Sequence, residues 1–104
     1  MNSPGLTMTP EVAFRLMDRL SKVKSVTQFD RPERPEAGTL AHSFVDLEKS
    51  FREVLDVLLP RLLDESLSPE QMNDVLLDIG EEFRHILYHI KDPKFFGYLL
   101  DTDK

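Results

Sequence analysis

The sequence of 104 residues contains no cysteine, which excludes disulfide bonds, thiolate metal sites and cysteine nucleophiles. This absence suits a reducing compartment. No apolar run approaches the roughly 20 residues that are needed to span a bilayer. Residues 1–8 also lack the basic and apolar parts of a signal peptide, so we expect a cytoplasmic location and no membrane partner.

The motifs of common enzyme chemistry are missing as well. The sequence has no glycine-rich phosphate loop and no Gly-x-Ser-x-Gly elbow. His42 and Ser43 are adjacent, but neighbouring residues of a helix do not face each other, so they form no nucleophile–base pair. We therefore predict no catalytic residues and no catalysis by this chain.

Positive charge is scarce, because 13 lysines and arginines stand against 19 acidic residues and give a net charge of −6. Residues 62–83 contain no lysine or arginine, whereas residues 15–34 are locally basic. Residues 62–83 contain seven acidic residues, namely Asp64, Glu65, Glu70, Asp74, Asp78, Glu81 and Glu82. This balance argues against a nucleic-acid partner and favours a basic protein partner.

Apolar residues recur at three- and four-residue spacing, which is typical of amphipathic helices, and no strand pattern stands out. We expect residues 1–8 to be a disordered tail and 9–104 to form a single helical domain. Thr9 as a cap and Pro10 in the first turn predict a first helix that ends near Lys22.

Residues 25–38 contain two prolines and a glycine, and they predict an extended proline-rich loop. A second helix is expected from near Thr39, and Pro60 on its polar face should kink or end it. Its apolar stripe comprises Leu40, Phe44, Leu47, Phe51, Leu55, Leu58 and Leu62.

Ser68, Pro69 and Gln71 mark the start of a third helix, which should end before Pro93. The face expected to be buried comprises Met72, Val75, Leu76, Ile79, Phe83, Ile86, Leu87 and Ile90. The short link between the second and third helices predicts an antiparallel hairpin. The predicted fold is therefore all-α, with three amphipathic helices in a small bundle and a short C-terminal helix or turn at 93–100.

The third helix also carries ligands that suit a metal ion. His85 and His89 are four residues apart, so both imidazoles can meet one ion, and Glu82 shares their side of the helix. The Glu82-x-x-His85 spacing resembles one element of the ferritin-like di-iron pattern, over four residues. Ferritin-like sites use two such motifs and two further glutamates, so the resemblance implies a half-site completed by a second copy, with Glu53 as an extra ligand.

Two interpretations of this face stay open. In one, the histidines lie among acids on a solvated surface and no cofactor is expected. In the other, Glu82, His85 and His89 bind iron, manganese or zinc.

The leading hypothesis is a protein-interaction module, such as an adaptor, an inhibitor or an immunity-type partner, that forms a homodimer or larger assembly. The alternative function is metal binding at the half-site. The apolar segment 93–100 should pack on the bundle or be buried by another chain. The candidate partner-binding residues are Asp74, Asp78, Glu81, Phe95, Phe96 and Tyr98.

Overall fold

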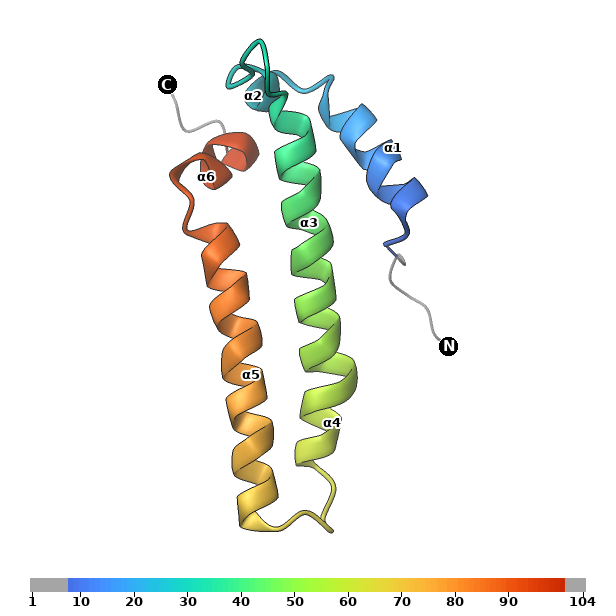
Figure 1. Cartoon of the computed structure of the whole chain (residues 1–104), viewed down its shortest axis with the longest axis vertical. Helices are drawn as coiled ribbons and strands as arrows, with labels where there is room; N and C mark the ends of the chain where they lie inside the picture. The colour runs from blue at the N-terminus through green and yellow to red at the C-terminus, as the bar shows by residue number, and fades with distance from the viewer. Residues whose placement is uncertain (1–7, 101–104) are drawn as a thin grey trace. The chain divides into compact units, whose positions relative to one another are not determined.

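The computed structural model describes residues 8–100, which are predominantly helical and contain no β-strand (Figure 1). The all-α prediction is therefore confirmed for this range. The chain divides into two compact units, one made of residues 1–45 and 93–104 and the other of 46–92. The three-helix bundle and the single domain stay predictions, and the predicted tail lies, apart from Met8, outside the described residues.

In the first unit, helix α1 (Pro10–Leu20) begins as predicted and ends two residues earlier than expected. The hydroxyl oxygen of Thr9 accepts a hydrogen bond from the backbone N–H of Val12 at 3.2 Å, which caps the first turn. None of its residues is fully buried, although Val12 and Leu16 are half-buried along one side.

The prediction of an extended loop over 25–38 is wrong. A short helix, α2 (Lys24–Thr27), lies in this region, and Arg31 and Arg34 exchange two backbone hydrogen bonds of 3.0 and 3.1 Å. Helix α3 (Glu36–Glu53) begins three residues before Thr39. The carboxylate of Asp30 accepts a hydrogen bond from the backbone N–H of Glu36 at 2.8 Å, so a side chain six residues upstream satisfies this first turn.

Helix α6 (Pro93–Leu100) contributes its apolar side to the core of the first unit. Phe95 and Tyr98 are buried, and the ring of Tyr98 meets that of Phe29 edge-on at 5.5 Å. The hydroxyl of Ser25 donates a hydrogen bond to the backbone oxygen of Tyr98 at 2.7 Å. The buried apolar residues of this unit are Val26, Ala37, Leu40, Ala41, Phe95 and Tyr98.

The second unit contains the later part of α3, a π-helical turn η1 (Val54–Leu58), helix α4 (Leu59–Leu62) and helix α5 (Pro69–Ile90). Pro60 has no backbone N–H and its ring disturbs the turn before it. The chain responds by widening that turn, so that the N–H of Leu59 reaches the oxygen of Val54. The predicted disturbance thus takes the form of a π turn, and the helix continues to Leu62.

Helix α5 begins where the sequence predicts. The Ser68 hydroxyl accepts a hydrogen bond from the backbone N–H of Gln71, and the Gln71 side chain accepts one from the N–H of Ser68. This capping box satisfies two N–H groups that the helix itself cannot pair. The turn η1 and helix α4 pack against α5, and the buried cluster comprises Val54, Leu58, Val75 and Ile79.

The apolar face of α5 is wider than the surface that covers it. Leu76, Phe83 and Leu87, all expected to be buried, are 55%, 53% and 54% exposed, so that part of the prediction is wrong. Phe51 and Leu55 are likewise exposed. Apolar spacing identifies the residues that favour burial, but one neighbouring helix covers only a narrow strip of such a face.

Within residues 8–100, every helix is either too short or too polar to cross a membrane.

Candidate metal centre

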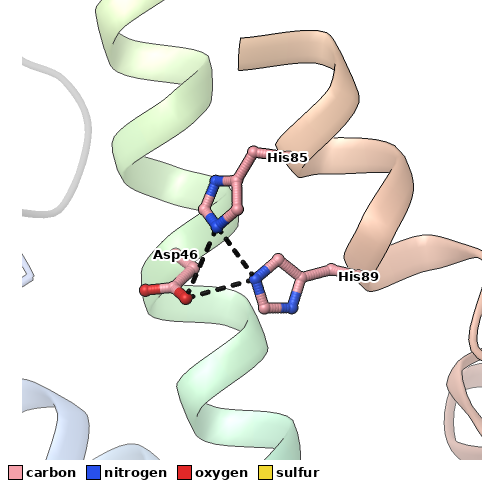
Figure 2. Close-up of side chains that lie close together, drawn as sticks. All are labelled: Asp46, His85 and His89. Atoms are coloured by element: carbon pink, nitrogen blue, oxygen red, sulfur yellow. Dashed lines mark hydrogen bonds and ion pairs between the residues drawn. The ribbon is translucent and has the colours of Figure 1, made fainter. Parts of the chain in front are cut away.

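Three side chains with metal-binding atoms meet between α3 and α5 inside the second unit (Figure 2). Nε2 of His89 lies 3.2 Å from Oδ2 of Asp46 and 3.3 Å from Nε2 of His85. The third side of this triangle, from Nε2 of His85 to Oδ2 of Asp46, measures 3.7 Å. The described residues thus bring two imidazole nitrogens and one carboxylate oxygen to a common point.

Local structure explains how these side chains meet. His85 and His89 are one helical turn apart on α5, so their rings leave the helix on the same side. Asp46 lies on α3, and its carboxylate meets His89 near the C-terminal end of α5. Val54 and Leu58 belong to a separate buried cluster with Val75 and Ile79, nearer the start of α5.

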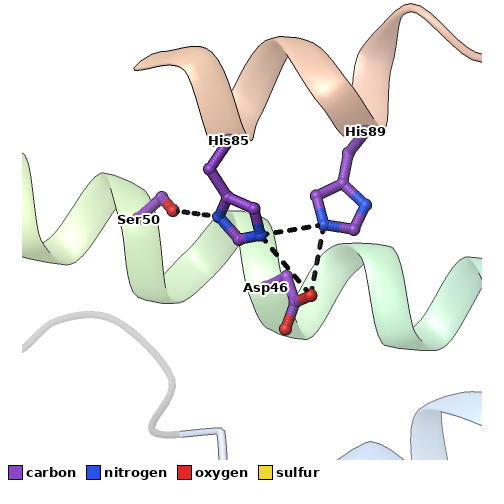
Figure 3. A network of polar contacts seen from close by, with 4 residues as sticks. All are labelled: Asp46, Ser50, His85 and His89. Carbon is purple, nitrogen blue, oxygen red and sulfur yellow. Dashed lines mark hydrogen bonds and ion pairs between the residues drawn. The ribbon is translucent and has the colours of Figure 1, made fainter. Parts of the chain in front are cut away.

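A fourth side chain holds one of the rings in place. Oγ of Ser50 lies 2.8 Å from Nδ1 of His85, on the opposite side of the ring from Asp46 (Figure 3). Ser50 is one turn after Asp46 on α3 and is buried. This hydrogen bond fixes the plane of the His85 ring and directs its Nε2 toward the other two atoms.

The three side chains differ in their access to water. The side chain of His89 is 6% exposed, whereas those of Asp46 and His85 are 24% and 43% exposed. The expectation that both histidines lie on a solvated surface is wrong for His89, which is buried where its Nε2 faces Asp46 of α3. The cluster has a closed side at His89 and an open side at His85 and Asp46.

Hydrogen bonds connect the three atoms, and their pattern depends on which ring nitrogens carry protons. If His89 carries its proton on Nε2, that one proton is shared between Asp46 and His85, and two lone pairs are left facing each other. If both Nε2 atoms carry protons, the two N–H groups point at one another. A single cation would face all three lone pairs at once.

The triangle also has the size that a metal ion requires. The nearest point equidistant from the three atoms lies in their plane, about 2.0 Å from each. An ion about 2.1 Å from each would lie about 0.7 Å to one side of that plane, and this distance matches zinc distances to nitrogen and oxygen. Ligand atoms on a tetrahedral zinc ion are about 3.4 Å apart, whereas ligands on an octahedral face at similar distances are about 3.0 Å apart. The sides of 3.2, 3.3 and 3.7 Å lie closer to the tetrahedral spacing.

Two of the three residues predicted as metal ligands, His85 and His89, belong to this cluster. Glu82 is half-buried and lies outside it, and Glu53, the suggested extra ligand, is exposed. The carboxylate in the cluster is Asp46, which the ferritin-like pattern does not include. In the sequence Asp46 falls on the polar face of α3, one turn after His42, and only the contact with α5 brings it to the two histidines.

The residues predicted to bind a partner are divided between surface and core. Asp74, Asp78 and Glu81 are exposed on α5, where Glu81 pairs with Arg84. Phe96 is 49% exposed. Phe95 and Tyr98 are buried in the first unit, so α6 offers a partner only one of its three aromatic candidates.

The first unit contains a separate buried charge that the sequence did not indicate. Glu36 is fully buried, and it accepts hydrogen bonds from the Tyr98 hydroxyl and from the Lys94 ammonium at 3.3 Å. Burial by itself raises the pKa of this carboxyl. The hydrogen bonds from Tyr98 and Lys94, with the charges of Lys94 and Arg34, outweigh burial and hold the pKa below its ordinary value.

Comparison of the chain with protein-family models, with curated proteins and with solved structures gives no match. The functional argument therefore rests on the side chains themselves.

Proposed function

We propose that this chain is a small helical metal-binding protein that holds one divalent transition-metal ion through Asp46, His85 and His89. The convergence of the three ligand atoms supports this proposal. Two imidazoles with one carboxylate suit zinc or iron rather than magnesium, and the spacing favours zinc. The Asp46 carboxylate replaces Glu82 as the oxygen ligand in this proposal, and no second copy is needed to supply ligands.

Ser50 fits this function as a positioning residue. A histidine that binds a metal through Nε2 keeps its remaining proton on Nδ1 and usually donates it to a neighbouring acceptor. The hydroxyl oxygen of Ser50 is at hydrogen-bond distance from Nδ1 of His85 and can accept that proton. The serine would thus select the ring form in which Nε2 is free for the metal.

Isothermal titration of tag-free protein with Zn²⁺ tests the proposal. We expect one saturable site in the unaltered chain, its loss in His85→Ala and in His89→Ala, and no binding of Mg²⁺. His42→Ala is the matched control, because His42 is an exposed histidine of α3 that does not belong to the cluster. Equal zinc affinity in the His89→Ala variant and the unaltered chain would rule the proposal out.

A second candidate function is that of a protein-interaction module, and the exposed apolar side of α5 favours it. We call Leu76, Phe83 and Leu87 the apolar flank; spacings of seven and four residues place them on one side of the helix. Apolar side chains gathered on one side of a helix are typical of contact surfaces. The exposed acids Asp74 and Asp78 add a preference for a basic protein partner.

If the chain is a protein-interaction module, its self-association through the apolar flank can be measured directly. Sedimentation velocity over a wide concentration range should show a dimer or larger species that Phe83→Ser weakens. Leu63→Ser is the control, because Leu63 is 82% exposed and lies outside the flank. A monomer at every concentration would count against self-association. As part of both candidates we propose a cytoplasmic, non-catalytic protein, since a chain without cysteine suits a reducing compartment.

A further inference from the structure

We infer that the metal centre binds a small anion as its fourth ligand, so that the site is an open anion-binding centre rather than a closed structural one. This inference rests on the metal-binding function proposed above. Structural zinc sites in proteins have four protein ligands, whereas sites that bind an external ligand have three and leave one position open.

The number of ligands is the first part of the argument. The cluster of metal-binding side chains in residues 8–100 has three members, Asp46, His85 and His89. The hydroxyl of Ser50 is directed at Nδ1 of His85 and not at the common point of the three ligand atoms (Figure 3). A tetrahedral ion at that point therefore keeps one position for a ligand from solution.

Access to solvent is the second part. The His89 side chain closes one side of the cluster, while the side chains of His85 and Asp46 are both open to water. We take this partly exposed side as the direction from which a small ligand approaches.

Charge is the third part. A divalent ion with two neutral imidazoles and one carboxylate carries a net charge of +1, so the centre attracts a monovalent anion more strongly than a neutral molecule. Ser50, which contacts Nδ1 of His85, is uncharged and leaves this balance unchanged. The expected ligand class is a small monovalent anion, including the carboxylate group of a small molecule.

Replacement of the metal by Co²⁺ tests this inference, because four-coordinate Co²⁺ has stronger visible absorption bands than the six-coordinate ion in water. The full chain is loaded with Co²⁺ and titrated with azide, then with acetate, and with neutral urea for comparison. We expect the bands to shift and saturate with the two anions and to stay unchanged with urea. His42→Ala should reproduce the unaltered chain, and His85→Ala should have no strong bands.

The outcomes separate the two claims. Strong bands that do not respond to either anion would overturn the open position while leaving metal binding in place. The absence of strong bands in a chain that still binds Zn²⁺ in the calorimetric titration would overturn the four-coordinate open site alone. The absence of both strong bands and Zn²⁺ binding would overturn the metal-binding function as well.

Discussion

The hydroxyl oxygen of Ser50 lies 2.8 Å from Nδ1 of His85, so a buried side chain of α3 orients a histidine of α5 from behind. Because of this hydrogen bond, the His85–His89 pair differs from two histidines that only lie on the same side of a helix. The bond links the ring to a second helix, and the same contact decides which nitrogen of His85 faces Asp46.

Ser50→Ala should therefore weaken Zn²⁺ binding about tenfold or more, the usual effect of removing a hydrogen-bond partner behind a metal ligand. Competition with a coloured chelator measures the affinity. Ser50→Thr keeps a hydroxyl at this position and should restore most of the binding. If both variants bound zinc as the unaltered chain does, Ser50 would have no positioning role.

Zinc should also stabilise the second unit, because the ion joins α3 to α5 in the folded state only. At a free Zn²⁺ concentration about 100 times the Kd, the free energy of unfolding should rise by about 2.7 kcal/mol. Urea titrations with and without zinc measure this gain, and His89→Ala should show none. A gain of equal size in His89→Ala would place the bound zinc elsewhere.

The sequence predicts the parts of this structure that depend on neighbouring residues. Ser68 and Gln71 predict the start of α5 because the capping box depends only on residues close in sequence. The four-residue spacing of His85 and His89 likewise predicts that both rings leave one side of the helix. The start of α3 was missed because its first N–H bonds to Asp30, six residues upstream across a turn. Asp46 joins the site only through the packing of two helices, which no local pattern encodes.

The burial of apolar side chains on α5 is predicted less well, because it too depends on contacts between helices. Val75, Ile79 and Ile86 are buried as expected, and Phe83 is not, although all four are apolar residues of one helix. Spacing gives the direction of a side chain but not the width of the neighbour that covers it.

Glu36 should make stability depend on pH. Its pKa in the folded chain lies below the ordinary value of 4.5, so the ionised carboxylate stabilises the folded state. This contribution is complete above about pH 4.5 and is lost as the pH falls through the lower pKa of the folded state. Glu36→Gln should be less stable than the unaltered chain at neutral pH, and the difference should shrink on acidification.

Thermal unfolding at a series of pH values tests this dependence. Glu33→Gln is the matched control, because Glu33 is exposed in the turn before α3 and should leave the profile unchanged. A constant difference between Glu36→Gln and the unaltered chain from neutral pH to pH 3 would contradict the prediction.

Gly80 offers a simple gain in stability. A Cβ atom at this position of α5 would meet nothing within 4 Å, so the glycine serves no close contact among the described residues. Gly80→Ala should raise the free energy of unfolding by about 0.5–1 kcal/mol, because alanine loses less backbone entropy in a helix. Chemical unfolding measures the change.

Gly97 provides the comparison. A Cβ atom there would lie 3.2 Å from the ring of Phe29, which is tighter than ordinary contact. Gly97→Ala should therefore gain less than Gly80→Ala or lose stability. A larger gain at Gly97 would show that the Phe29 ring moves aside at little cost.

The wide turn at Val54–Leu58 corrects the phase of the helix that contains it. Val54, Leu58 and Leu62 follow one another at intervals of four, and each such step advances about 40° around an ordinary α-helix. Over two such steps the side chains would rotate about 80° around the helix, away from α5. The π turn contains one more residue per turn than an α-helix, and this extra residue offsets the rotation. Residues spaced four apart therefore continue to face α5 without supercoiling of the two helices. A longer row of contacts at four-residue spacing would need another π turn.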